Sequence, residues 1–200
     1  DRAAGLKTGG FISGYRGSPL GGYDRALWRA QSLLRANNIH FQPGLNEDLA
    51  ATSVWGSQQS HLFPGPTVDG VFSIWYGKGP GVDRSADVLK HGNSAGSSRH
   101  GGVLVVAGDD HGAQSSTLAH QSEQIFSAAM IPVLNPATVQ DYLDYGLYGF
   151  ALSRFSGCWV GFKAITETFE SSASVDVGLD RLSFVEPDFD GPVDGLSIRW

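Results

Sequence analysis

The alternation of short apolar segments with helical ones constrains the fold of this chain more than any other feature. Residues 102–107 (GVLVVA) form a continuous, largely β-branched run, as expected for a parallel strand buried on both faces. The predicted strands are 10–15, 39–42, 70–76, 102–107, 131–134 and 158–163, and the predicted helices are 22–36, 47–61, 82–91, 117–129 and 138–153. This order is typical of a doubly wound α/β fold with a mainly parallel sheet and helices on both faces.

Residues 171–200 break the alternation. They hold short strand-like pieces (SASVDV, RLSFVEP and GLSIRW) separated by Asp, Gly and Pro. We therefore expect an α/β domain over residues 1–170 and a short β-rich extension over 171–200, which is a linker or the start of a second domain. The chain starts without Met and stops within a strand-like pattern, so we expect a fragment of a longer protein.

Composition argues against several classes of partner and site. The 14 basic and 20 acidic residues give a net charge of −6 without a basic cluster, which argues against nucleic acid and anionic membrane surfaces. No apolar run approaches the roughly 20 residues of a membrane helix. The single cysteine, Cys158, indicates a reducing compartment and cannot supply the about four ligands of an iron–sulfur cluster. The six histidines lack metal-site spacing, so we expect no metal site here.

Polar or glycine-rich turns follow four consecutive predicted strands. They are residues 15–22 (YRGSPLGG), 43–48 (PGLNED), 77–81 (GKGPG) and 108–111 (GDDH). The carboxyl ends of parallel strands share one edge of the sheet, and ligands bind beyond that edge at a topological switch point. Each turn alone could serve only folding, but together they predict a ligand site.

Standard nucleotide and hydrolase motifs do not explain these turns. The chain has neither G-x-G-x-x-G nor G-x-x-x-x-G-K-[ST]. Residues 92–96 (GNSAG) match the G-x-S-x-G nucleophile elbow, but that motif requires a preceding strand, and a helical pattern precedes it here.

Six segments carry a resemblance to a known family. They are GFISGYRGSPLGGYD, HFQPGLNEDLAATSVWGSQQ, WYGKGPGVDRSADVLKHGNSAGSSRHGGVLVVAGDDH, QSSTLAHQSE, AMIPVLNPATVQDYLDYGL and SRFSGCWVGFKAI, within a resemblance that covers residues 5–200. The chain resembles the N-terminal, pyrimidine-binding domain of indolepyruvate:ferredoxin oxidoreductases, in particular their long fused bacterial branch.

The resemblance implies a reaction, cofactors and partners for the whole protein. A 2-oxoacid such as indolepyruvate would be oxidatively decarboxylated with coenzyme A, giving acyl-CoA, CO₂ and electrons for ferredoxin. Thiamine diphosphate would be bound through its aminopyrimidine by this domain, whereas Mg²⁺ and 4Fe–4S clusters would be held elsewhere in the full-length protein. The implied assembly is a cytoplasmic homo-oligomer that includes the remaining domains. Since thiamine-diphosphate sites are shared by two domains, residues 1–200 alone are expected to be inactive.

Glu47 matches the activating glutamate of that family. The implied chemistry is a hydrogen bond from a protonated glutamic acid to a pyrimidine ring nitrogen, which favours an imino tautomer able to remove the thiazolium proton. The alternative is that Glu47 only complements the dipole of a helix at its first turn, worth under about 1 kcal/mol. Asp48 could fill that second role equally well.

Other residues of these loops are assigned with less detail. The resemblance places Gly17, Gly77 and Lys78 at the cofactor, and Ser18 facing the substrate or cofactor. Ser18 could instead be a helix N-cap with Pro19 at the first helical position, and both roles could hold at once.

The substrate pocket has its own candidates. Lys90 and His91 resemble a Lys-His pair near the active site of two-subunit relatives, where a cation would suit a carboxylate substrate. The loop after the central strand is expected to line the pocket through Asp109, Asp110, Ser115 and Ser116, with His111 and His120 as further candidates.

Two alternatives stay open at this point. The chain could be the pyrimidine module of a non-oxidative thiamine-diphosphate decarboxylase or synthase. It could also be an inert α/β domain that serves subunit interaction.

Overall fold

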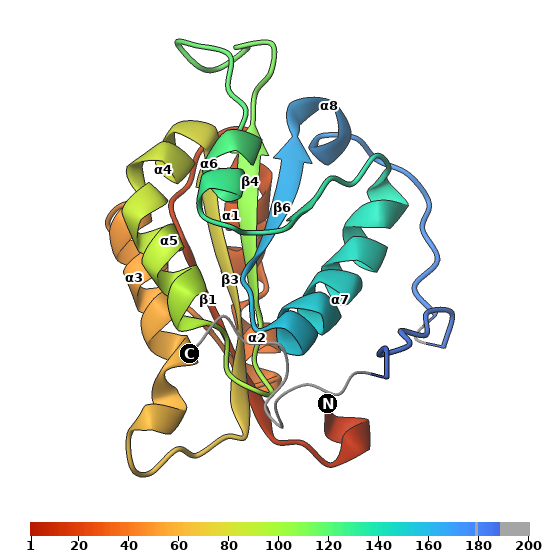
Figure 1. Ribbon diagram of the computed structural model, residues 1–200. Helices are drawn as coiled ribbons and strands as arrows, with labels where there is room; N and C mark the ends of the chain where they lie inside the picture. The colour runs from red at the N-terminus through yellow and green to blue at the C-terminus, as the bar shows by residue number, and fades with distance from the viewer. Residues whose placement is uncertain (179, 189–200) are drawn as a thin grey trace.

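One parallel sheet organises the protein. The computed structural model describes residues 1–178 and 180–188. Its strands are β1 (Thr8–Gly14), β2 (Ile39–Phe41), β3 (Gly70–Lys78), β4 (Val103–Asp109), β5 (Val133–Leu134) and β6 (Val160–Ile165). They pair in the order β2-β1-β3-β4-β6-β5, and every pairing is parallel (Figure 1).

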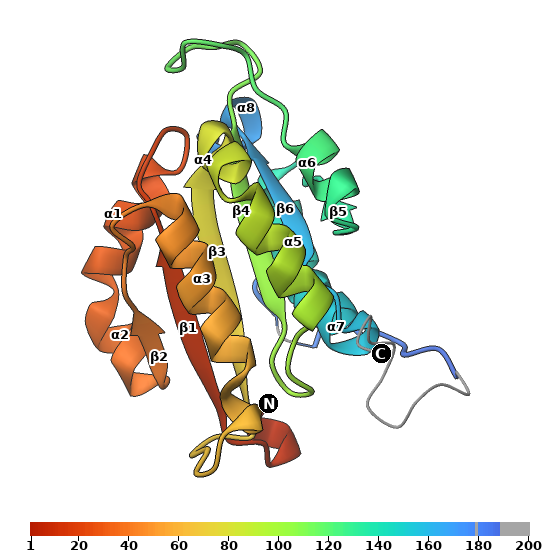
Figure 2. The same cartoon turned by 60° about the vertical axis from the view of Figure 1, so that its left-hand side comes forward.

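Helices cover both faces of this sheet (Figures 1 and 2). They are α1 (Gly21–Arg29), α2 (Gln31–Ala36), α3 (Glu47–Gln58), α4 (Gly79–Arg84), α5 (Ala86–Ala95), α6 (Glu123–Ala128), α7 (Val139–Ser156) and α8 (Thr166–Phe169), with short 3-10 turns at Arg2–Ala4 and Ser60–Leu62. Helices α3 to α6 pack on one face, and α1, α2, α7 and α8 pack on the other. The predicted doubly wound α/β fold is therefore confirmed.

Strand periodicity explains the two cores. Along β3, Ile74 and Tyr76 face the α1–α7 side whereas Trp75 between them faces the α3–α6 side, as the two-residue period of a strand requires. Trp75 and Trp159 are fully buried in the α3–α6 core. Strand β4 is buried along its whole length, which matches the continuous apolar run seen in its sequence.

Helix boundaries differ from the expected ones in three places. The helix expected over 22–36 is divided at Ala30, and the one expected over 82–91 begins at Gly79 and is divided at Ser85. The helix expected from residue 117 begins only at Glu123. The carboxylate of Asp110 accepts hydrogen bonds from the backbone N–H groups of residues 114 and 115, and that of Asp109 accepts one from the N–H of residue 122. These residues therefore form a loop in place of the first helical turns.

The described part of the tail corrects the expectation of a β-rich extension. Residues 171–178 and 180–188 form no strand. The backbone of Asp176 instead bonds to the side chain of Gln140 on α7, with Asp176 N to Gln140 Oε1 at 2.7 Å. Arg181 pairs with Asp144 on the same helix. The third strand-like piece, GLSIRW, lies outside the described residues, the last of which is residue 188.

Within the described chain, no helix combines the length and the apolarity that crossing a bilayer requires.

Candidate functional site

The sheet has a topological switch point between β1 and β3. These neighbouring strands lead to helices on opposite faces, β1 to α1 and β3 to α4, so their carboxyl-terminal loops diverge and open a crevice where ligands bind in such folds. The loops touch at its base, because a Cβ placed on Gly17 would lie 3.2 Å from Cβ of Lys78. The predicted loops thus meet at one edge of the sheet.

Helix α3 holds Glu47 at this edge. Asn46 is the N-cap, and its Oδ1 accepts a hydrogen bond from the backbone N–H of Leu49 at 2.9 Å. The buried indole of Trp75 donates from Nε1 to the carbonyl oxygen of Glu47 at 2.9 Å. The backbone of Glu47 is therefore held both by its own helix cap and by β3.

The side chain of Glu47 is left without a structural task. It is half-buried, and its carboxylate has no hydrogen-bond or salt-bridge partner among the described residues. Asp48 differs, because its Oδ1 accepts a hydrogen bond from Nε of Arg84 at 2.7 Å. That hydrogen bond lowers the pKa of Asp48. Asn46 caps the helix and Asp48 forms the ion pair, so neither role explains Glu47.

Two glycines of α4 make room on either side of its first turn. A Cβ on Gly81 would lie 2.5 Å from Cγ of Glu47, and one on Gly79 would lie 2.1 Å from Nδ1 of His120. The GKGPG run therefore lets backbone pass between two polar side chains. Gly77 has a different environment: it is buried in β3, and a Cβ there would lie 2.6 Å from the indole of Trp75. Packing alone accounts for Gly77.

The loop over residues 110–122 projects beyond the sheet edge (Figure 1). Asp110 organises it by accepting hydrogen bonds from the backbone N–H groups of Gln114 at 2.9 Å and Ser115 at 2.8 Å. The N–H groups of Ser115 and Gln114 lower the pKa of Asp110. Lys78 donates from Nζ to the carbonyl oxygen of Ser115 at 2.6 Å, so Lys78 joins the end of β3 to the loop that follows β4. Ser116 is half-buried in the same loop.

A buried charged cluster lies beneath this loop. Lys163 of β6, only 1% exposed, contacts Glu123 of α6 and lies 3.5 Å from Oδ2 of the fully buried Asp109. Asp109 also accepts from Ser122, from N at 2.9 Å and from Oγ at 2.6 Å. Burial acts to raise the pKa of Glu123, but the hydrogen bond and charge of Lys163 outweigh it and lower that pKa.

Both candidate histidines of the loop join this cluster. His111 Nε2 lies 3.0 Å from Nζ of Lys163. His120 Nε2 lies 2.9 Å from Asp83 of α4, and its Nδ1 lies 3.5 Å from Asp109. Sequence reasoning missed Lys163 and Glu123. A lysine at the end of an apolar strand pattern was the available signal.

Ser18 lies on the opposite side of the crevice from Glu47. Helix α1 begins at Gly21 with Leu20 before it, so the alternative of Ser18 as its N-cap is wrong. Pro19 and Leu20 instead pack against Gly108, where a Cβ would lie 3.0 and 2.8 Å from them. Ser18 lines a cavity of about 320 Å³ together with Arg16, Arg25 and Glu170.

Lys90 and His91 are not brought to this edge. Both are exposed on α5, and His91 stacks on Trp55 with ring centroids 6.1 Å apart. Trp55 follows Glu47 by eight residues in α3, which is about 12 Å along the helix axis. The structure therefore separates the Lys-His pair from the loops of the candidate site, because α5 carries it away from the edge.

The G-x-S-x-G match lies in the last turns of α5, without a strand before it. Its Asn93 is fully buried and supports packing, with Nδ2 donating to Ala129 O at 2.8 Å and Oδ1 accepting from Trp159 N at 2.8 Å. In the described residues, no three His, Cys, Asp or Glu side chains are grouped so as to hold a metal ion.

Comparison with known proteins supports the fold. No family model and no curated protein matches the sequence. The structure resembles the X-ray structure of a protein from Mycobacterium smegmatis that is described as a candidate thiamin diphosphate-dependent enzyme, with a TM-score of 0.58 and 16% identity. The match covers 92% of this chain but only 32% of that protein, so the chain spans about a third of its neighbour. At this level of identity, the likeness shows that the chain shares the fold of part of that protein.

Proposed function

We propose that this chain is the aminopyrimidine-binding part of a thiamine-diphosphate-dependent enzyme and that Glu47 is its activating acid. One observation carries the proposal: a half-buried carboxyl group at the carboxyl edge of the sheet has no hydrogen bond or salt bridge among the described residues, while its neighbours fill the structural roles. The fold shared with the mycobacterial protein supports the same cofactor.

The residues around Glu47 fit a flat nitrogen heterocycle. Gly81 presents bare backbone beside the Glu47 side chain, which allows a ring to approach closely. Glu47 would donate a hydrogen bond to a ring nitrogen, and the capped α3 backbone would keep the carboxyl group in place. Thiamine diphosphate, when bound, supplies a carbon nucleophile for attack on a keto group. The contribution of this chain is to orient the ring and hold a proton at the Glu47 carboxyl group.

We further propose a 2-oxoacid:ferredoxin oxidoreductase of the indolepyruvate type as the whole enzyme. This finer assignment rests on the resemblance of residues 5–200. In it, coenzyme A and ferredoxin are partners of the complete protein, and Mg²⁺ and 4Fe–4S clusters belong to parts outside this chain. The cavity beside Ser18, with Arg16 and Arg25 on its wall, is the place where a substrate carboxylate would find cationic partners.

The decisive experiment is Glu47→Gln in the complete protein. Glutamine keeps the size of the side chain but cannot hold the transferable proton, so oxoacid-dependent reduction of a viologen dye should fall at least about 100-fold. Calorimetric titration should still detect thiamine diphosphate binding, because the contact surface is nearly unchanged.

Asp48→Asn is the matched control, because it removes a carboxylate one residue away whose partner is Arg84. It should leave the rate within a few-fold of the native protein. A near-native rate for Glu47→Gln, or an equal loss in both variants, would refute the role of Glu47.

A further inference from the structure

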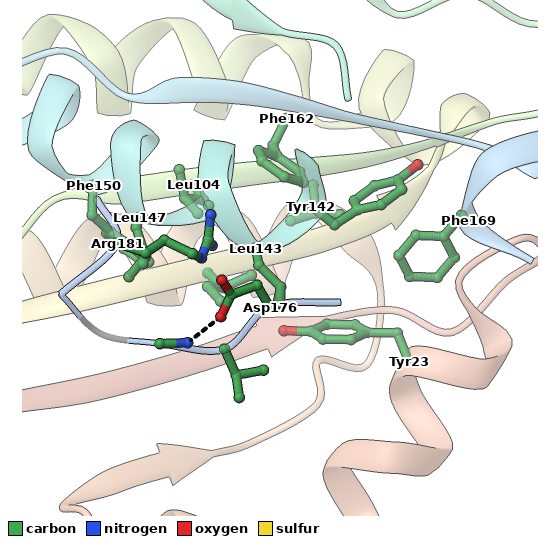
Figure 3. A pocket seen from close by; sticks show the side chains of 15 residues that line it. Tyr23, Leu104, Tyr142, Leu143, Leu147, Phe150, Phe162, Phe169, Asp176 and Arg181 are labelled. Carbon is green, nitrogen blue, oxygen red and sulfur yellow. Dashed lines mark hydrogen bonds between the residues drawn. The ribbon is translucent and has the colours of Figure 1, made fainter. Parts of the chain in front are cut away.

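An apolar chamber (Figure 3) lies on the α1–α7 face of the sheet, whereas α3 packs on the opposite face. Its volume is about 510 Å³, within the range of small-molecule sites. Its floor is formed by Ile74 of β3 and by Leu104 and Val106 of β4, and residues of α1 and α7 form its sides. No described side chain fills this space, although it lies over the centre of the sheet.

A segment of the tail lies along one side of the chamber. We call it the strap and define it as residues 176–178 together with 180 and 181. Gln140 of α7 holds one end, accepting from Asp176 N at 2.7 Å and donating to Asp176 O at 3.2 Å. Arg181 holds the other end through its pair with Asp144 of α7. The strap is therefore attached to α7 at two points.

Gly146 of α7 is a glycine whose position packing does not explain. It lies in the interior of α7 and lines the chamber, although glycine destabilises a helix interior relative to alanine. A Cβ at Gly146 would meet nothing within 4 Å, whereas one at Gly149 in the next turn would lie 2.6 Å from Leu104. Packing therefore explains Gly149 but not Gly146, where the missing side chain only enlarges the chamber.

Tyr23 supplies one polar group to the chamber. Its ring packs edge-on against Tyr76, with centroids 5.4 Å apart, and its hydroxyl is directed into the chamber (Figure 3). None of the described residues hydrogen-bonds that hydroxyl, whereas the hydroxyl of Tyr142 is paired with Thr168 at 2.7 Å. Burial raises the pKa of Tyr23, so the phenol stays neutral and can donate a hydrogen bond.

We propose that this chamber binds an uncharged, mainly apolar small molecule with one hydrogen-bond acceptor, which pairs with the Tyr23 hydroxyl. Arg181 is paired with Asp144, and the carboxylate of Asp176 accepts a hydrogen bond from Gly178 N at 2.8 Å, so the charged groups of the wall already have partners within the protein. Such a site is separate from the candidate site at the carboxyl edge and does not depend on the proposed function.

The test uses Nile red, a neutral planar dye with a carbonyl acceptor, and the complete protein. We expect saturable binding at one site per chain with a blue-shifted emission. Gly146→Leu, which fills the chamber, should weaken binding by about 10-fold or more, as changes in apolar pockets do. Tyr23→Phe should weaken it less. Gly56→Leu is the matched control, because Gly56 is an exposed helical glycine in α3 with nothing within 4 Å of its Cβ position.

Three results would overturn the proposal. The first is native-like dye binding by Gly146→Leu, and the second is an equal loss in Gly56→Leu. The third is a concentration-dependent dimer in sedimentation velocity that Gly146→Leu dissociates, which would make the chamber a contact between copies. If the leucine variant does not fold, Gly146→Ala provides the same comparison with a smaller expected loss.

Discussion

At the scale of single residues, two neighbouring acidic side chains have different environments. Asp48 is hydrogen-bonded to Arg84, whereas Glu47 faces the bare backbone of Gly81 and has no hydrogen bond or salt bridge in the described chain. Both lie in the first turn of α3, so the helix dipole favours both equally. The difference comes from α4, which supplies an arginine to one carboxylate and a glycine to the other.

Gly81→Ala tests whether the space beside Glu47 matters. The added methyl group would displace the Glu47 side chain, and a displacement of about 1 Å in a reacting group can cost about 100-fold in rate. We expect a comparable loss of viologen reduction in the complete protein with its thermal stability nearly unchanged. Gly56→Ala, at an exposed position of α3 with nothing within 4 Å of its Cβ position, should retain the native rate. Native activity in Gly81→Ala would show that the gap is not used.

At the scale of elements, the cluster around Lys163 joins pieces that are distant in sequence. Lys163 lies on β6, Asp109 on β4 and Glu123 at the start of α6. The cluster holds both ends of the 110–122 loop, since Asp109 precedes the loop and binds Ser122 at its end. The long loop is therefore closed by buried electrostatic contacts.

Lys163→Met should destabilise the fold. It leaves the buried Asp109 without its cation, and removing one partner of a buried pair costs about 3–5 kcal/mol. The measurement is urea unfolding, where the midpoint should fall without a large change in slope. Lys90→Met, at an exposed position of α5, should change the free energy of unfolding by no more than about 0.5 kcal/mol. Equal midpoints for the two variants would contradict the role of the cluster.

The turn at Asp110 should loosen in acid. Its backbone hydrogen bonds lower the pKa of Asp110 in the folded protein. The stabilisation is therefore complete above the unfolded pKa of about 3.9 and is lost as pH falls through the lower folded value. Hydrogen exchange of the Gln114 and Ser115 amides, corrected for intrinsic rates, should show protection lost over that range. Asp110→Asn should remove this pH dependence. If amide protection in the variant still depends on pH as in the native protein, the role of the Asp110 carboxylate is refuted.

At the scale of the whole molecule, the two faces of the sheet carry different features. The carboxyl edge gathers Glu47 and the polar loops, and the α1–α7 face holds the apolar chamber. In the proposed function, the thiamine diphosphate site is shared between two domains and this chain supplies one side of it. We expect residues 1–200 expressed alone to show no oxoacid decarboxylation, measured as CO₂ release. Measurable turnover by that protein would refute a shared site.

Much of the architecture could be predicted from local pattern. Each predicted strand corresponds to an observed one, because a two-residue period or a continuous apolar run reports burial within a few neighbouring residues. Helix starts were harder to predict. The first turn of α6 depends on which carboxylates capture backbone donors of the loop, and those carboxylates, Asp109 and Asp110, lie up to 13 residues earlier.

The sequence by itself determined the class of fold and the edge at which the polar loops meet, and its resemblance to a known family led to the prediction that Glu47 is the activating acid. Only the tertiary structure decided that Arg84 hydrogen-bonds to Asp48 and not to Glu47, that Lys90 and His91 lie far from the edge, and that the described tail bonds to α7 and forms no strand. The physical reason is the range of the interactions. Periodicity reports the burial of a segment, whereas partners such as Arg84 and Asp48, 36 residues apart, are chosen only when the helices pack.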